Sequence, residues 1–252
     1  MARPKVGLFV TCLVDLLRPN VGFAALKLLR EAGCEVAVPR TQTCCGQPAY
    51  NSGAEADAAA IARQTIAAFE NFDYVVAPSG SCAGMLRLHY PALLAKDAAW
   101  AARAGDFAGR CHELFSFLVN VRGVTSVSAR CEVAAAYHDS CSSLREMGVR
   151  DEPRKLLASV SGLTLSDIAD AQACCGFGGA FCVKYPEVSA RIGSDKLECA
   201  VKSGANLVLG GDLGCLLHLA GLAARQNRGM EFRHAAEVLA GETETPPLGR
   251  AK

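Results

Sequence analysis

The sequence has no apolar run long enough to cross a membrane. A membrane-spanning helix needs about 20 consecutive apolar residues, and the nearest approach, residues 207–224, is interrupted by Asp212 and His218. The apolar N-terminal stretch is broken by Thr11 and Asp15, and no small-residue cleavage site follows it. We therefore expect no signal peptide and no membrane span, and a cytoplasmic location.

An excess of charge of either sign is also missing. The chain has 26 Lys and Arg residues against 25 Asp and Glu residues, a formal net charge of +1. Binding to nucleic acid or to an anionic membrane favours a basic run, and there is none. No G-x-G-x-x-G motif follows the first predicted strand, so a nucleotide cofactor is not expected either.

Cysteine, in contrast, is abundant: 13 of the 252 residues. A reducing cytoplasm disfavours disulfides, which leaves metal binding or catalysis as the better explanations. Eight cysteines form two sets, with internal spacings of 32, 1 and 37 residues in the first and 33, 1 and 40 in the second. The pattern recurs after 129 to 133 residues, which indicates an internal repeat. The first quartet is Cys12, Cys44, Cys45 and Cys82, and the second quartet is Cys141, Cys174, Cys175 and Cys215.

The segments around the cysteines predict the fold class. Short apolar, strand-like runs lead into the first and last cysteine of each quartet. Alanine-rich segments between them predict helices at residues 21–32, 54–70, 152–160 and 186–203, and a closing helix in each half at 111–121 and 232–240. Strands that alternate with helices indicate mostly parallel sheets whose ligands gather at the carboxyl ends of the strands.

We therefore expect an α/β protein of two pseudo-symmetric repeats, with mostly parallel sheets flanked by helices. The predicted domains are residues 1–125 and 126–252, each with one cysteine quartet. The polar segment at residues 241–252 is expected to be disordered.

Adjacent cysteines suit some metal centres better than others. Structural zinc usually takes thiolates two to four residues apart. Neighbouring cysteines point in different directions and reach two metal atoms more easily, as at an iron–sulfur cluster, and four thiolates match a four-iron cluster. The glycines that follow allow backbone amides to approach cluster sulfurs, which makes them candidate cofactor-binding residues: Gly46, Gly176, Gly178 and Gly179. Zinc stays open as an alternative, above all at the first quartet.

The doubled cysteine motif resembles a known family. Two copies of a C…CCG…C pattern, the second with "YHDSC" and "CCGFGG", resemble tandem cysteine-rich (CCG) iron–sulfur proteins of the lactate utilisation protein A type. These are related to the cysteine-rich subunit of heterodisulfide reductase and to the iron–sulfur subunit of glycolate oxidase. The resemblance covers residues 5–240 and implies one or two iron–sulfur clusters, with the cysteines of the two quartets as their ligands.

The same resemblance implies an activity. It suggests an oxidoreductase subunit that transfers electrons in the oxidation of L-lactate to pyruvate, together with two companion subunits that include another iron–sulfur protein. The heterodisulfide reductase motif closes with CxxC, whereas Ser79 and Asp212 stand at the earlier cysteine position here. This difference favours an ordinary four-iron cluster over a noncubane one, and makes Asp212 a candidate oxygen ligand. Two alternatives stay open: a thiol or disulfide oxidoreductase, and a zinc-stabilised, non-enzymatic scaffold.

The two halves are not identical. His138 and Asp139 of the second half align with Phe9 and Val10 of the first. Because histidine titrates near neutral pH, His138 is a candidate catalytic residue that relays protons or binds a carboxylate, with a structural role as the alternative. Five further cysteines are expected to be buried, with Cys182 as a candidate extra ligand: Cys34, Cys111, Cys131, Cys182 and Cys199.

Overall fold

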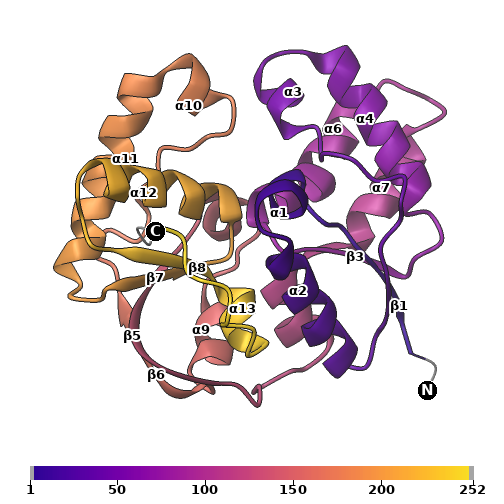
Figure 1. The fold of residues 1–252 in the computed structure, drawn as a ribbon. Coiled ribbons are helices and arrows are strands. Elements are labelled where there is room, and N and C mark those ends of the chain that lie inside the picture. Colours follow the sequence, from indigo (N-terminus) through magenta and orange to yellow (C-terminus); the bar gives the residue numbers. More distant parts are fainter. Residues whose placement is uncertain (1–2, 250–252) are drawn as a thin grey trace.

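The chain forms two four-stranded parallel sheets, one in each half (Figure 1). The computed structural model describes residues 3–249. The first sheet has the order β2-β1-β3-β4 and the second the order β6-β5-β7-β8, with every neighbouring pair parallel. The strands are β1 Lys5–Leu8, β2 Glu35–Ala37, β3 Tyr74–Ala77, β4 Cys111–Glu113, β5 Arg130–His138, β6 Ser161–Asp167, β7 Leu207–Gly210 and β8 Glu231–His234. The predicted α/β fold with two repeats is confirmed.

Helices flank both sheets. In the first half they are α1 Cys12–Leu17, α2 Pro19–Glu31, α3 Gln47–Asn51, α4 Glu55–Ala68, α5 Gly80–Gly84, α6 Tyr90–Leu94, α7 Ala101–Arg110 and α8 Leu114–Ser116, with π-helical turns η1 Met85–His89 and η2 Phe117–Val121. In the second half they are η3 Ser142–Glu146, α9 Asp151–Leu157, α10 Phe181–Lys184, α11 Pro186–Lys202, α12 Leu213–Arg225 and α13 Ala235–Leu239.

The central strands are apolar because they are covered on both faces. All four residues of β7 are buried, and so are the last three of β1. Continuous apolar runs of this kind are typical of parallel strands, which exclude water from both sides of the sheet. The repeat therefore places two equivalent strand ends, those of β1 and β5, in a dry interior.

The strand order determines where ligands can gather. In each sheet the second strand lies on one side of the first strand, and the third and fourth strands lie on the other side. The strand order therefore reverses between β1 and β3, and again between β5 and β7, and ligands bind at such topological switch points. Cys12 closely follows β1 and Cys82 follows β3, while Cys141 and Cys215 occupy the same positions after β5 and β7. The fold thus collects cysteines at the carboxyl edge of each sheet.

The two halves pack against each other pseudo-symmetrically. Helix α1 of the first half contacts α12 of the second, and the equivalent pair, η3 of the second half and α5 of the first, is also in contact. In the same way α2 contacts α13, and the equivalent elements α9 and α8 contact each other. One apolar core contains Val6 and Leu8 of the first sheet together with Ala135 and Leu209 of the second. Because this core needs both halves, we expect residues 1–125 and 126–252 expressed separately to be less stable than the whole chain. The division near residue 125 stays a prediction.

Three local expectations were wrong. Residues 111–121 and 232–240 are not wholly helical, because the first range begins with all of the edge strand β4 and the second with the last three residues of the edge strand β8. Residues 241–249 are not disordered: Leu248 forms an antiparallel bridge with Phe232, and the Pro246 carbonyl accepts a 2.8 Å hydrogen bond from Arg18. Residues 250–252 lie outside the described residues.

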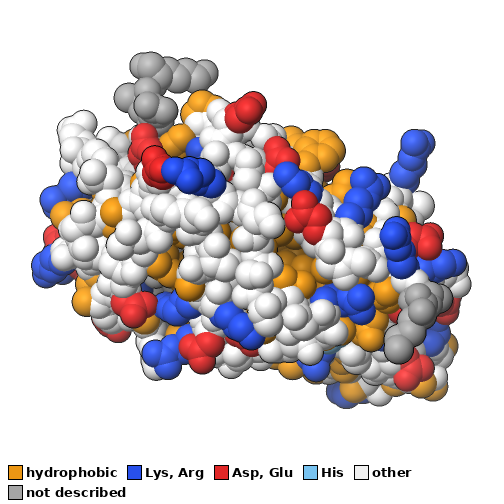
Figure 2. Space-filling model, turned by 90° about the horizontal axis from the view of Figure 1, so that it is seen from below, with side chains coloured by type: hydrophobic (Ala, Val, Ile, Leu, Met, Phe, Trp, Pro, Cys, Tyr) orange, Lys and Arg blue, Asp and Glu red, His pale blue; other side chains and the backbone are white. Residues whose placement is uncertain are grey.

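No helix within residues 3–249 is long and apolar enough to span a membrane. On the face shown in Figure 2, acidic and basic side chains are interspersed, without a continuous field of one sign. This agrees with the balanced composition of the chain.

Candidate metal centre

The first quartet assembles from three loops at the carboxyl edge of the first sheet. Cys12 begins α1, whose N-terminus is capped by the Thr11 hydroxyl, and Cys82 lies in the first turn of α5. Cys44 and Cys45 lie in the loop after β2. The sulfurs of Cys12 and Cys44 are 3.7 Å apart, and the Cys45 thiol is hydrogen-bonded to Cys44 and Cys82. All four predicted residues are therefore brought together.

The second quartet repeats this arrangement. Cys141 directly precedes η3, Cys215 lies in the first turn of α12, and the adjacent pair follows β6. The Cys174 thiol is hydrogen-bonded to Cys141 and Cys175, and Cys175 is also hydrogen-bonded to Cys215. Within residues 3–249, which include all thirteen cysteines, none forms a disulfide. Four free, mutually contacting thiols are a donor set that suits soft metals and iron–sulfur clusters.

One thiol in each quartet is strongly acidic. Hydrogen bonds from the Cys12 and Cys45 thiols lower the pKa of Cys44 to about 2. Bonds from Cys141 and Cys175 lower the pKa of Cys174 to about 2 in the same way. The hydrogen bond to the acidic thiol, followed by burial, raises the pKa of Cys12 and Cys141 well above the usual range. Each metal-free quartet thus contains one thiolate that its neighbours stabilise.

This asymmetry predicts selective alkylation of the metal-free protein. Cys44 and Cys174 should react with iodoacetamide at pH 6, where an ordinary thiol with a pKa near 8.5 is almost wholly protonated. Cys12 and Cys141 are similarly half-buried and serve as internal controls. Peptide mass spectrometry at short reaction times measures the four rates. Equal labelling of all four thiols would contradict the assignment of the thiolates.

Backbone amides also point at the sulfurs of the second quartet. The Gly176 amide donates to the Cys174 sulfur at 3.3 Å, and the Phe177 amide to the Cys175 sulfur at 3.5 Å. In the first quartet, the Gly46 amide likewise hydrogen-bonds the Cys44 sulfur. Such bonds stabilise negative charge on sulfur, so they would stabilise an anionic cluster.

Gly176 is required by its surroundings as well as by its backbone. It has a φ of +85°, and a Cβ there would lie 2.4 Å from the Ser189 carbonyl oxygen. Gly179 also has a positive φ, of +60°, but a Cβ there would meet nothing within 4 Å. Gly176→Ala should therefore destabilise the fold by more than Gly179→Ala, which carries about 1–2 kcal/mol of backbone strain alone. Urea unfolding of the two variants measures the difference, and equal losses would show that the Ser189 contact relaxes freely.

The two quartets face each other across a shared wall. The first lines a cavity of about 300 Å³ and the second a cavity of about 230 Å³. Ser81, Phe177 and Asp212 line both cavities. Asp212 belongs to the second half, yet one of its carboxylate oxygens accepts hydrogen bonds from the Ser79 and Ser81 hydroxyls at 3.0 and 2.7 Å. We call Ser81, Phe177 and Asp212 the wall between the two quartets; its hydrogen bonds connect the first half to the second.

Ser79 and Asp212, which stand where the related motif has a cysteine, have a structural function in this chain. Ser79 caps the N-terminus of α5, and Asp212 caps α12 by accepting from the Gly214 amide at 3.2 Å. Since both oxygens of Asp212 already accept hydrogen bonds, a role as a metal ligand would require the wall to open. Sequence reasoning missed this contact because the partners are 131 and 133 residues apart.

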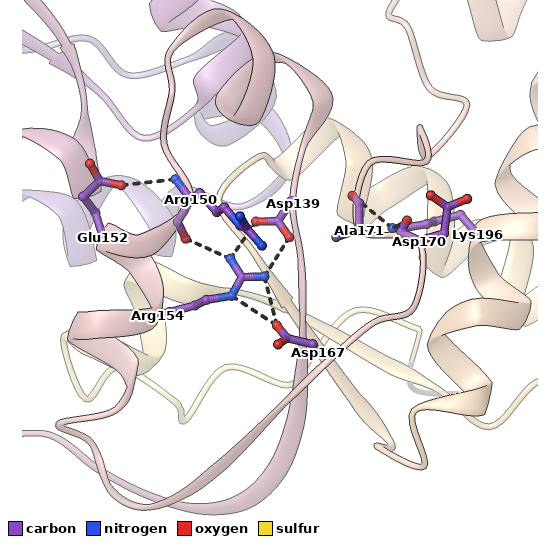
Figure 3. Close-up of polar contacts among 8 residues, drawn as sticks. All are labelled: Asp139, Arg150, Glu152, Arg154, Asp167, Asp170, Ala171 and Lys196. Carbon is purple, nitrogen blue, oxygen red and sulfur yellow. Dashed lines mark hydrogen bonds and ion pairs between the residues drawn. The ribbon is translucent and has the colours of Figure 1, made fainter.

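Charged residues hold the loops that carry the second quartet (Figure 3). Arg154 of α9 makes two 2.8 Å hydrogen bonds to Asp139, two residues before Cys141, and also contacts Asp167 at the end of β6. The buried Lys196 of α11 donates to the Asp170 carbonyl at 2.8 Å. These contacts fix the chain before Cys141 and before the adjacent pair.

His138 lies at the end of β5 beside the second quartet. It is 1% exposed, and a ring nitrogen lies within 4.8 Å of the sulfurs of Cys175 and Cys215, which are likewise within 4.8 Å of each other. Burial, together with the charge of Lys196, lowers the pKa of His138 to about 4. His138 is not among the residues that line either of the two cavities. The catalytic role predicted for it stays a prediction.

The remaining cysteines lie outside the quartets. Cys34 and Cys111 are buried as expected, whereas Cys131, Cys182 and Cys199 are only partly buried. Cys131 and Cys199 pack against the outside of an apolar core rather than within it. The Cys182 thiol donates to the Gly179 carbonyl at 3.1 Å.

Comparison with known proteins supports the repeat and extends over nearly the whole chain. Residues 6–87 and 135–220 each match the cysteine-rich domain family, CCG. Lactate utilization protein A of Bacillus subtilis (strain 168) is 46% identical over 235 residues, covering 93% of this chain and 98% of the relative. Lactate utilization protein A 2 of Bacillus cereus (strain Q1) is 42% identical over 94% of this chain and 98% of its own length.

A solved structure shows the same fold. A hypothetical protein from Helicobacter pylori aligns with all of this chain at a TM-score of 0.69, with 9% sequence identity, and the aligned part is 53% of that structure. The two cysteine-rich repeats and the near full-length identity to these relatives lead to one conclusion: the chain belongs to the lactate utilization protein A family of tandem cysteine-rich domain proteins.

Proposed function

We propose that this chain is a cytoplasmic iron–sulfur electron-transfer subunit of a complex that oxidises L-lactate to pyruvate. The observation that carries the proposal is the assembly of four free thiols at the carboxyl edge of each sheet. The relatives named lactate utilization protein A supply the substrate. We further propose two companion subunits, one of them another iron–sulfur protein.

In this proposal the first quartet and the second quartet each hold one cluster, with Gly46, Gly176, Gly178 and Gly179 shaping the loops around them. An iron–sulfur cluster supplies reversible one-electron transfer. The residues of the chain fix the ligands: helix caps position Cys12, Cys82 and Cys215, and backbone amides stabilise negative charge on sulfur. The two centres would lie on opposite sides of the wall, and the hydrogen bond from Ser81 to Asp212 would hold the two halves together at this point.

The alternative of a thiol or disulfide oxidoreductase is less well supported. A heterodisulfide-reductase-like centre has a fifth cysteine in its closing CxxC, and the positions concerned are Ser79 and Asp212. These two side chains are hydrogen-bonded to each other at 3.0 Å. Neither offers a thiol, which favours a four-thiolate cluster in each half. A zinc-stabilised scaffold is the other alternative, and metal analysis separates it from the proposal.

Reconstitution tests the proposed function. The anaerobically purified chain, combined with its companion subunits, should lose part of its visible cluster absorbance when L-lactate is added. A Cys175→Ser chain in the same complex is the control and should transfer electrons far more slowly. Reduction of the other subunits by L-lactate with no change in this chain would contradict the proposal.

A further inference from the structure

The two halves differ at one buried position beside their quartets. Phe9 lies three residues before Cys12, and His138 lies three residues before Cys141. Both stand at the end of the equivalent strand of the repeat, and both are almost fully buried, at 0% and 1% exposure. Phe9 packs in the apolar cluster that contains Cys45 and Cys82. Its counterpart lies within 4.8 Å of Cys175 and Cys215, the equivalent cysteines of the second half.

His138 is energetically unfavourable at this position unless something binds it. Neither of its ring nitrogens has a hydrogen-bond partner within residues 3–249. A buried polar group without a partner costs about 1–3 kcal/mol. The first half shows that the repeat accepts an apolar aromatic side chain here, without that cost. The orphaned nitrogens and their distance from two thiols therefore point to a ligand on the thiol side of the ring.

The surroundings of His138 indicate that its side chain binds a metal centre rather than a substrate. His138 does not line the cavity beside the second quartet, but a ring nitrogen lies within 4.8 Å of the sulfurs of Cys175 and Cys215, so its nearest potential ligand partners are on the side of these two sulfurs. Its backbone is held firmly, because it pairs in register with Gly210 and precedes Asp139, which Arg154 clamps with two 2.8 Å bonds. A fixed imidazole beside two cysteines is a typical mixed nitrogen and sulfur donor set.

We propose that His138 is a ligand of the second metal centre, which then has one nitrogen donor in addition to its cysteines, while the first centre has sulfur donors alone. The inference rests on the proposed function, because it requires a cluster in the second quartet. Four thiolates already match the irons of a four-iron cluster, so the His138 nitrogen would be a fifth donor, to an iron that a neighbouring cysteine also binds.

Electron spin echo spectroscopy tests this ligation directly. A Cys45→Ser variant removes the first centre, so that the reduced protein reports the second centre alone. With ¹⁵N-labelled histidine, we expect a strong nitrogen coupling that changes with the label. Backbone amides that donate to sulfur give much weaker couplings, which do not respond to the histidine label.

Two variants complete the experiment. His138→Phe reproduces the first-half residue; it should keep the iron of the second centre and lose the labelled coupling. His218→Phe is the matched control: His218 also lies near the second quartet, but its Nε2 already pairs with the Ser189 hydroxyl at 3.3 Å, so the labelled coupling should persist.

The outcomes separate the two claims. A cluster that is present by iron analysis but shows no histidine coupling in the labelled Cys45→Ser protein would overturn the ligation by His138 alone. A second quartet that binds no iron under anaerobic conditions would overturn the proposed function and this inference together. The labelled measurement on the Cys45→Ser protein does not depend on the folding of any His138 variant.

Discussion

Cys175→Ser is expected to abolish the second metal centre and to leave the first intact. Cys175 is 2% exposed and its thiol contacts those of Cys174 and Cys215, so it lies in the middle of the second quartet. Serine nearly keeps the volume but offers a hard oxygen donor in place of a soft thiolate. Iron in the anaerobically purified chain should fall to about half, because the proposed function places one cluster in each quartet.

In the proposed function, the rate of lactate-dependent electron transfer by the Cys175→Ser protein should fall at least as much as its iron content, because electrons can no longer pass through the second centre. The matched control is Cys199→Ser, a change of the same chemistry at a partly buried cysteine of α11 outside the quartets. It should leave iron and activity unchanged. Full iron content in the Cys175→Ser protein, or equal losses in the two variants, would show that the ligands are wrongly assigned.

Arg18→Ala is expected to cause the largest loss of stability. Arg18 of the first half and Glu237 of the second are 6% and 0% exposed, and the Arg18 Nε lies 3.1 Å from both carboxylate oxygens. Removing one partner of a buried ion pair costs about 3–5 kcal/mol, and the lower end of this range is expected here because Arg233 stays 3.8 Å from the Glu237 carboxylate. The Pro246 carbonyl also loses its 2.8 Å hydrogen bond from Arg18.

Lys27→Ala provides a matched control for this prediction. Lys27 also joins the first half to the C-terminal segment, through Glu242, but the two side chains are 43% and 48% exposed. An exposed pair of this kind contributes about 0–1 kcal/mol. Urea unfolding of the two variants should therefore differ by several kcal/mol. If Arg18→Ala were no more destabilising than Lys27→Ala, the buried pair would not hold the two halves together.

Much of the fold follows from the spacing of the cysteines. Parallel strands end at the same edge of a sheet, so residues such as Cys12 and Cys82, placed just after predicted strands, were expected to meet. The repeat of the pattern then predicted the second sheet. The pattern predicted only the strands that lead into the first and last cysteine of each quartet. It did not predict β2, β4, β6 and β8, because no cysteine of the pattern directly follows them.

The electrostatic details of the site were less accessible to sequence reasoning. The sequence identifies Asp212 as a departure from a related motif, but not as a cap that reaches across to Ser81 of the other half. The sequence likewise marks His138 as different from Phe9. That both of its nitrogens lack a partner depends on the packing around the end of β5, which no local pattern determines.

The measurement that tests the central claim most directly is metal and sulfide analysis of the whole chain, purified without oxygen. Two cysteine quartets with one cluster each predict about four irons and four sulfides per quartet, and a lower content if only one site survives purification. Stoichiometric zinc without acid-labile sulfide, or the absence of any metal from a folded and fully reduced chain, would contradict the account.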